Sequence, residues 1–99
     1  MPVTVERQET HWRIRLEGEL AMASMAELQS ALLEGLASKK ELHLDMTRTD
    51  EIDLAALQLL WAAGRAAGRA GTKILARISD AVAATAQDAG FERFPVPVE

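Results

Sequence analysis

Residues 39–71 decide the fold class, because an alternating stretch and a long helical stretch follow each other there. They read KKELHLDMTRTDEIDLAALQLLWAAGRAAGRAG. In the first part, Leu42, Leu44 and Met46 alternate with His43 and Asp45, which is the period-two pattern of a half-buried strand. The residues that follow Met46 are polar, and we expect them to form a turn.

The second part of this stretch predicts a helix from Leu54 to about Ala70, because Leu and Ala dominate it and both are strong helix formers. Asp53 precedes the helix as its expected N-cap, and Gly71 is expected to stop it in the left-handed C-cap conformation. The inward stripe is predicted at Leu57, Leu60, Trp61 and Gly64, and the solvated stripe at Gln58, Arg65 and Arg69.

The N-terminal flank predicts two strands and a helix. Residues 3–6 alternate weakly and residues 11–17 clearly, with Trp12, Ile14 and Leu16 on one face, so the two segments are expected to form a hairpin. Ser24 followed by Glu27 resembles a capping box. A helix is therefore expected from about Met25 to Ser38, with its apolar face formed by Met25, Leu28, Leu32 and Leu36.

The C-terminal flank predicts one more strand and a third helix. Lys73 to Ile78 is expected to be a short strand, and Ser79 or Asp80 to cap a helix that ends at Gly90. Pro95 and Pro97 leave room for an edge strand at most, because neither can donate a ladder hydrogen bond.

The element order is therefore β-β-α-β-α-β-α, and residues 1–99 are expected to form a single α/β domain. Strands that alternate with helices favour a sheet with parallel neighbours. We predict a four- to five-stranded mixed sheet with three helices packed on it. The strands are expected to bury, at least in part, Trp12, Ile14, Leu16, Leu42, Leu44, Ile74 and Ile78.

Composition excludes several function classes. The chain has 99 residues, no cysteine and a net charge of −4, so disulfide frameworks, thiolate chemistry and phosphate-driven nucleic-acid binding are not expected. The longest uninterrupted apolar run, Leu59 to Ala63, is far shorter than the ~20 residues that span a bilayer. We expect a cytoplasmic protein without direct membrane insertion and without a cofactor.

The titratable side chains do not form a catalytic pattern. His11 and His43 are far apart in the sequence, and no glycine pattern of a nucleophile elbow surrounds any serine. Four carboxylates, Asp45, Asp50, Glu51 and Asp53, precede the second helix; they either complement a helix N-terminus or bind a divalent ion. Because the spacing of a calcium loop is absent, we predict the structural role and no metal site.

Four segments in the same order resemble the STAS family. Residues 51–60, EIDLAALQLL, resemble its Ile-Asp-Ser-(Ser/Thr/Ala)-Gly-Leu-x-x-Leu segment, and residues 16–20, LEGEL, its Leu-x-Gly-Glu-Leu-Asp strand end. Residues 42–46, LHLDM, resemble its Leu-x-Leu-Asp-Leu strand, and residues 79–82 with 89–91 resemble its third helix. The resemblance covers almost the whole chain and implies a binding module of the anti-sigma-factor antagonist type.

In the antagonists that this chain resembles, a partner kinase phosphorylates a hydroxyl at the start of the second helix. The two corresponding positions here are Leu54 and Ala55, which cannot accept phosphate. The family glycine is replaced by Ala56, and the aspartate after Gly-x-Leu by Ala21. We therefore expect no phosphorylation at this site; Thr47 and Thr49 are the nearest other hydroxyls.

The resemblance implies a non-catalytic protein-protein interaction module of bacterial signal transduction or regulation, similar to an anti-sigma-factor antagonist or a chemoreceptor-linked (chemotaxis) STAS adaptor. Its partner would be a kinase-like anti-sigma factor or a chemoreceptor-cluster protein. Two alternatives stay open: the cytosolic regulatory subunit of a phospholipid-transport ABC complex, which contacts a transporter ATPase, and a small-ligand-binding domain. The predicted partner-binding residues are Asp53, Leu54, Ala55, Gln58, Met22 and Ala23.

Overall fold

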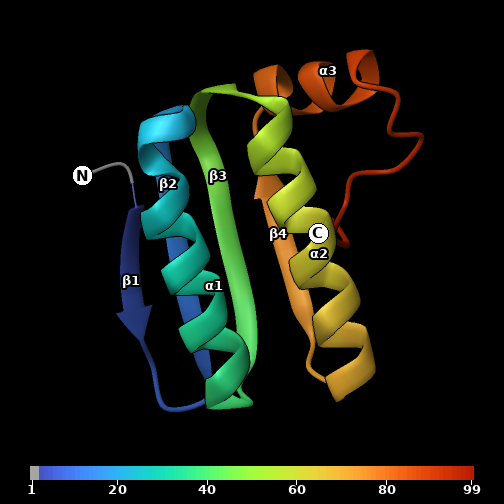
Figure 1. The fold of residues 1–99 in the computed structure, drawn as a ribbon. Coiled ribbons are helices and arrows are strands. Elements are labelled where there is room, and N and C mark those ends of the chain that lie inside the picture. Colours follow the sequence, from blue (N-terminus) through green and yellow to red (C-terminus); the bar gives the residue numbers. More distant parts are fainter. Residues whose placement is uncertain (1–2) are drawn as a thin grey trace.

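A four-stranded mixed sheet forms the centre of the structure, a computed structural model that describes residues 3–99 (Figure 1). Its strands are β1 (Val3–Arg7), β2 (His11–Leu20), β3 (Glu41–Ile52) and β4 (Ile74–Ile78), and they lie in the order β1-β2-β3-β4. β1 pairs antiparallel with β2, whereas β2, β3 and β4 run parallel. The predicted mixed sheet and hairpin are confirmed.

Two long helices cover one face of this sheet. α1 (Met25–Ser38) connects β2 to β3 and α2 (Leu54–Ala70) connects β3 to β4, and the two lie side by side (Figure 1). α3 (Asp80–Asp88) follows β4 and lies across the end of the sheet. The predicted order of strands and helices and the bounds of α1 and α2 are confirmed. Within residues 3–99, no helix has both the length and the apolar character needed to cross a membrane.

The core lies between the sheet and these helices. The predicted strand residues Ile14, Leu16, Leu42, Leu44 and Ile74 are buried, while Trp12 and Ile78 are partly buried against them. α1 contributes Leu28 and Leu32, and α2 contributes Leu57 and Leu60. Alternation in the strands and three-to-four spacing in the helices thus bring their apolar faces together.

The turn expected after Met46 is wrong, because β3 continues to Ile52. Between the pairs Arg15↔Asp45 and Glu17↔Arg48, and again between Gly18↔Thr49 and Glu19↔Glu51, β3 has one residue more than β2. These bulges allow pairing to continue through a polar stretch. Thr49 is buried and its hydroxyl donates a hydrogen bond to the carbonyl oxygen of Leu16 (2.8 Å).

Two helix expectations also differ from the structure. A short 3₁₀ turn, Met22–Ser24, leads into α1, so Ser24 is already helical (φ −95°, ψ −5°) and its side chain makes no cap hydrogen bond. A cap needs extended backbone, which explains why the capping box is absent. Trp61 lies on the outside of α2 and is 48% exposed, with the Arg65 guanidinium 4.8 Å from its ring centroid.

The C-terminal segment follows the free edge of β4, as the two prolines predicted. Val98 forms an isolated parallel bridge with Ala76; the Ala76 N–H donates to the Pro97 carbonyl (2.8 Å), and the Glu99 N–H to the Ala76 carbonyl (2.9 Å). Gly64 of α2 lies so close to this segment that an added Cβ would be 2.9 Å from the Pro95 carbonyl oxygen. The predicted edge position is confirmed.

Candidate functional site

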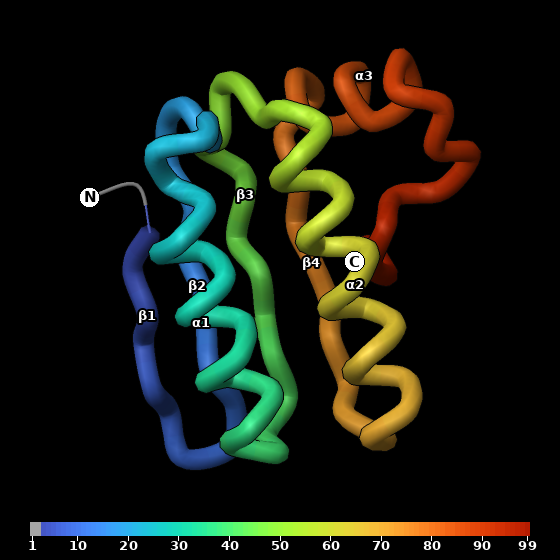
Figure 2. The backbone as a smooth tube through the Cα atoms, viewed as in Figure 1, coloured from blue at the N-terminus to red at the C-terminus, as the bar shows by residue number. Residues whose placement is uncertain are grey.

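The ends of β2 and β3 bring the two predicted partner-binding segments together. Leu20 and Ile52 are register partners, and the Asp53 N–H donates a hydrogen bond to the Leu20 carbonyl (3.3 Å). The turn that contains Met22 and Ala23 therefore emerges at the same end of the sheet as the start of α2 (Figure 2). We call the surface of Met22, Ala23, Asp53, Leu54, Ala55 and Gln58 the strand-end surface.

Asp53 has a defined structural role within this surface. Its backbone is extended (φ −95°, ψ 171°), and its carboxylate accepts a hydrogen bond from the Ala56 N–H (3.0 Å). The Leu57 N–H donates to the Asp53 carbonyl (3.2 Å). Asp53 is therefore the N-cap of α2, as its position in the sequence predicted.

The strand-end surface exposes two large apolar side chains. Met22 is 71% exposed and Leu54 is 52% exposed, and neither belongs to the core. The positions that form a hydrophobic staple around an Asp53 cap are held by Ile52 and Leu57, and both are buried. Leu54 is consequently free to contact another molecule, with Ala23 and Gln58 exposed beside it.

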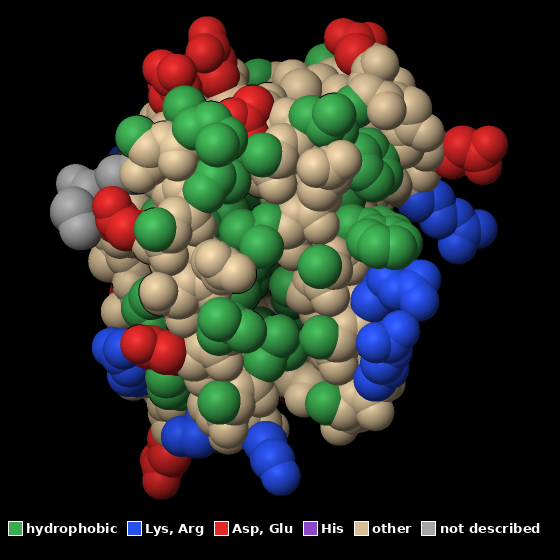
Figure 3. All heavy atoms as spheres, viewed as in Figure 1, with side chains coloured by type: hydrophobic (Ala, Val, Ile, Leu, Met, Phe, Trp, Pro, Cys, Tyr) green, Lys and Arg blue, Asp and Glu red, His purple; other side chains and the backbone are tan. Residues whose placement is uncertain are grey.

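Carboxylates lie around this apolar surface. Glu19, Asp50 and Glu51 are exposed at the ends of β2 and β3, and Figure 3 shows acidic side chains gathered at this end of the molecule. The Ser79 hydroxyl donates to the Thr49 carbonyl (2.8 Å), which holds the start of α3 and the exposed Asp80 at the same end. An apolar patch bordered by carboxylates suits a partner with an apolar pocket and basic residues at its rim.

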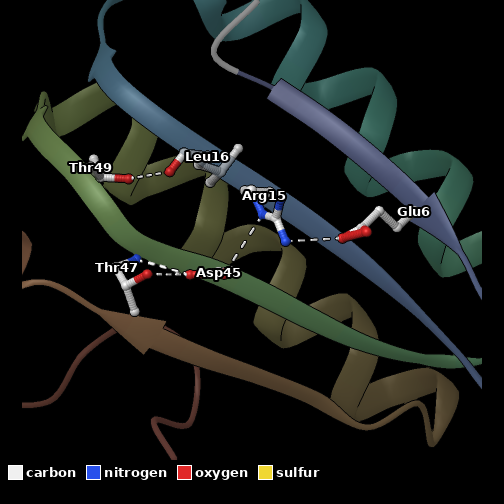
Figure 4. A network of polar contacts seen from close by, with 6 residues as sticks. All are labelled: Glu6, Arg15, Leu16, Asp45, Thr47 and Thr49. Atoms are coloured by element: carbon white, nitrogen blue, oxygen red, sulfur yellow. Dashed lines mark hydrogen bonds and ion pairs between the residues drawn. The ribbon is translucent and has the colours of Figure 1, made fainter.

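Asp45 does not join these carboxylates, although the sequence places it near them. It lies on the sheet face that α1 and α2 leave uncovered, where Arg15 pairs with it (3.8 Å) and with Glu6 (3.3 Å) (Figure 4). Among residues 3–99, no three side chains of the metal-binding types lie close enough together to hold an ion.

The two threonines near the site differ in accessibility. Thr49 is 1% exposed and its hydroxyl is engaged with Leu16, so a kinase cannot reach it in the folded chain. Thr47 is exposed, and its hydroxyl donates to the Asp45 carboxylate (2.7 Å) (Figure 4). Both lie on β3 and not at the start of α2.

The hydrogen bond from the Thr47 hydroxyl, together with a second from its backbone N–H (3.1 Å), lowers the pKa of Asp45 from its usual value, and Arg15 lowers it further. A carboxyl group whose pKa falls on folding stabilises the native state above its ordinary pKa, and that contribution is lost as the pH falls through the folded value.

We therefore expect Thr47→Ala to raise the pKa of Asp45 toward its usual range, because the side-chain hydrogen bond is lost and only the backbone hydrogen bond and Arg15 still lower it. The variant should unfold at lower urea concentration than the wild type at neutral pH, and the difference should shrink in acid. NMR titration of the carboxyl carbon measures the pKa. Thr47→Ser is the control, since it keeps the hydroxyl; an unchanged Asp45 pKa in Thr47→Ala would contradict the assignment.

The proximity of His11 and His43 was not predicted from the sequence. Their rings stack with centroids 4.5 Å apart, and the Nε2 of His43 lies 3.0 Å from a carboxylate oxygen of Glu41. That hydrogen bond lowers the pKa of Glu41. The signal that would have found the pair is strand register, because His11 pairs with Glu41 at the start of two parallel strands.

Comparison with known proteins supports this architecture. A family model described as Mlab, STAS domain, matches residues 3–97. Among solved structures, an anti-sigma factor antagonist from Mycobacterium paratuberculosis is 19% identical, with 97% of this chain and 82% of that chain covered and a TM-score of 0.77. The unphosphorylated form of the anti-sigma factor antagonist SpoIIAA is 12% identical, with 98% and 86% covered and a TM-score of 0.75.

A third solved structure, with a lower TM-score, is similar over the same part of the chain. An uncharacterised protein with a SpoIIAA-like fold from Shewanella loihica PV-4 is 16% identical, with 98% of this chain and 82% of that chain covered and a TM-score of 0.57. No curated protein sequence matches the chain. At these identities the solved structures establish the fold alone.

Proposed function

Because the chain belongs to the STAS domain family, we propose that residues 1–99 form one non-catalytic protein-protein interaction module of a bacterial signalling or regulatory system. It acts in the cytoplasm and resembles an anti-sigma-factor antagonist or a chemoreceptor-linked adaptor. Its partner is a protein that binds the strand-end surface.

The observation that carries this proposal is the exposure of Leu54 at the first position of α2. Where the related proteins place a small hydroxyl, this chain presents an apolar side chain. If a partner buries it fully, the burial contributes about 1.5 to 3 kcal/mol to binding. The acidic residues around it favour a partner whose contact surface carries Lys or Arg.

The same position implies that binding is not switched by phosphorylation at the start of α2. A phosphoryl group there would place a dianion beside Asp53 and weaken an apolar interface by repulsion and desolvation. Leu54 and Ala55 have no oxygen that accepts phosphate. We infer that association is constitutive or is regulated on the partner.

We expect protein purified from its own cells to carry no phosphate on residues 47–58. Thr49 is buried and Thr47 is engaged with Asp45, so neither replaces the missing acceptor. Intact-mass measurement followed by peptide mapping checks this. Stoichiometric phosphate on either threonine would contradict it.

The experiment that tests the function is quantitative affinity capture from the native lysate, with the wild-type chain and Leu54→Asp as parallel baits. Capture of a kinase-like anti-sigma factor or a chemoreceptor-cluster protein supports the proposal. A transporter ATPase would instead favour the regulatory subunit of a phospholipid-transport ABC complex. Equal recovery of every protein by both baits would remove the strand-end surface from consideration.

A further inference from the structure

The two helices that cover the sheet carry opposite charges. The only charged residues of α1 are Glu27 and Glu34, and the only charged residues of α2 are Arg65 and Arg69. Both helices begin at the same end of the sheet and run side by side in the same direction (Figure 1). The face that they form is therefore acidic on one side and basic on the other.

An apolar strip separates the two charged sides. A hollow of about 230 Å³ lies between the helices, and Leu33 at its border is 60% exposed. Figure 3 shows hydrophobic side chains along this hollow and basic side chains along the far side of α2. The hollow is lined from α1 by Leu32, Leu33 and Leu36, and from α2 by Leu59, Ala62 and Ala66.

We propose that two copies of the chain associate face to face through α1 and α2, about a two-fold axis parallel to the helices. This axis lays α1 of each copy against α2 of the other, so that acidic and basic sides meet twice. A two-fold axis in the same plane but perpendicular to the helices would lay α1 on α1 and α2 on α2, which brings like charges together. Charge complementarity therefore selects the first axis.

The heights of Glu34 and Arg65 match in this arrangement. Glu34 lies about 14 Å along α1 from Met25, and Arg65 lies about 17 Å along α2 from Leu54, at 1.5 Å per residue. A parallel axis keeps heights equal, so Glu34 of one copy faces Arg65 of the other. Glu34 already pairs with Arg7 (3.1 Å), but both side chains are 57% exposed, and a carboxylate accepts further hydrogen bonds.

The size of the face formed by α1 and α2 sets the expected affinity of the dimer. Helices of 14 and 17 residues are about 21 and 26 Å long, which gives an interface at the low end of the range for stable complexes. We expect a reversible dimer with a dissociation constant in the micromolar range. The hollow and Arg65 lie C-terminal to Gln58 on α2, so the centre of the dimer interface does not include the strand-end surface.

Sedimentation equilibrium of the purified chain over a wide concentration range tests the proposal. Leu33→Glu, Arg65→Glu and Glu34→Lys should each weaken the dimer at least about tenfold, because a like charge or an unpaired charge then enters the interface. The double variant Glu34→Lys with Arg65→Glu should recover most of the wild-type affinity, since only the α1-against-α2 arrangement brings these two positions together.

The control variants are Ala84→Glu and Arg93→Glu, which make the same changes of charge as Leu33→Glu and Arg65→Glu at exposed positions outside this face and should leave the dimer unchanged. A wild-type chain that remains monomeric at millimolar concentration overturns the proposal and leaves the face for another occupant, such as an acidic helix. A double variant as weak as the single variants also overturns it. Leu54→Asp should keep the dimer, so failure here is separable from failure of the proposed function.

Discussion

Leu54→Asp is expected to abolish binding of the partner while leaving the melting temperature near that of the wild type. Leu54 is half exposed and outside the core, so its loss creates no cavity. An aspartate at the first position of a helix is favourable to the helix dipole, so α2 itself should not weaken. In the interface, the change removes apolar area and places a carboxylate in the partner's apolar pocket, where the charge is buried without a partner.

Titration of the purified partner against both chains measures the affinity, and thermal unfolding followed by circular dichroism measures the stability. Ala84→Asp is the matched control, because it adds the same charge at an exposed position of α3, and it should bind as the wild type does. A large fall in melting temperature would mean that Leu54 supports the fold. Unchanged affinity would mean that the partner binds elsewhere.

Leu57→Ala is expected to lower the free energy of unfolding by about 2 to 5 kcal/mol, whereas Leu54→Ala should change it by only about 0.5 kcal/mol. The two leucines lie three residues apart on α2, but Leu57 is fully buried between the helix and the sheet. Truncating it removes apolar contacts and leaves a cavity. For a domain whose total stability is about 5 to 15 kcal/mol, the first loss is a large fraction.

Urea unfolding of the two variants, analysed with a common slope, gives the comparison. Leu54→Ala is the control for Leu57→Ala, because the residue type, the helix and the substitution are the same and only the burial of the side chain differs. Similar losses in the two variants would contradict the separation of Leu54 from the core, and with it the case for the strand-end surface.

The sequence predicts those parts of this fold whose determinants are local. Alternation in residues 42–46 and the Leu and Ala content of residues 54–70 identify the central strand and the longest helix, and the Asp53 and Gly71 caps define that helix to the residue. Caps act over one turn of chain, so their effect can be seen in a short stretch of sequence.

The predictions that are wrong concern residues whose structure depends on segments far away in the sequence. Residues 47–52 are polar enough for a turn, yet they pair with β2 because two bulges and the Leu16 carbonyl accommodate them. Trp61 lies on the outside although its spacing matches the inward stripe, because that side of α2 faces Phe91 and the C-terminal segment instead of the sheet. Neither contact is encoded near the residue that it affects.

The position of the candidate site could be predicted from the sequence for a topological reason. Parallel strands end at one edge of the sheet, so the segments after Leu20 and Ile52 had to meet, whatever their residues. The exposure of Leu54 could not be predicted from the sequence, since the spacing of apolar residues also allows Leu54 to fold onto the core. The burial of Leu54 depends on how α2 packs on the sheet, and that packing involves residues of both layers.

The C-terminal segment also has a consequence for solubility. An uncovered outer strand offers a row of free N–H and C=O groups that can recruit a strand from another molecule and start aggregation. Here the Pro97 carbonyl accepts from the Ala76 N–H and the Glu99 N–H donates to the Ala76 carbonyl, so the C-terminal segment occupies backbone groups on the outer edge of β4. Purification tags are therefore better attached at the N-terminal end, where they leave this protective cover undisturbed.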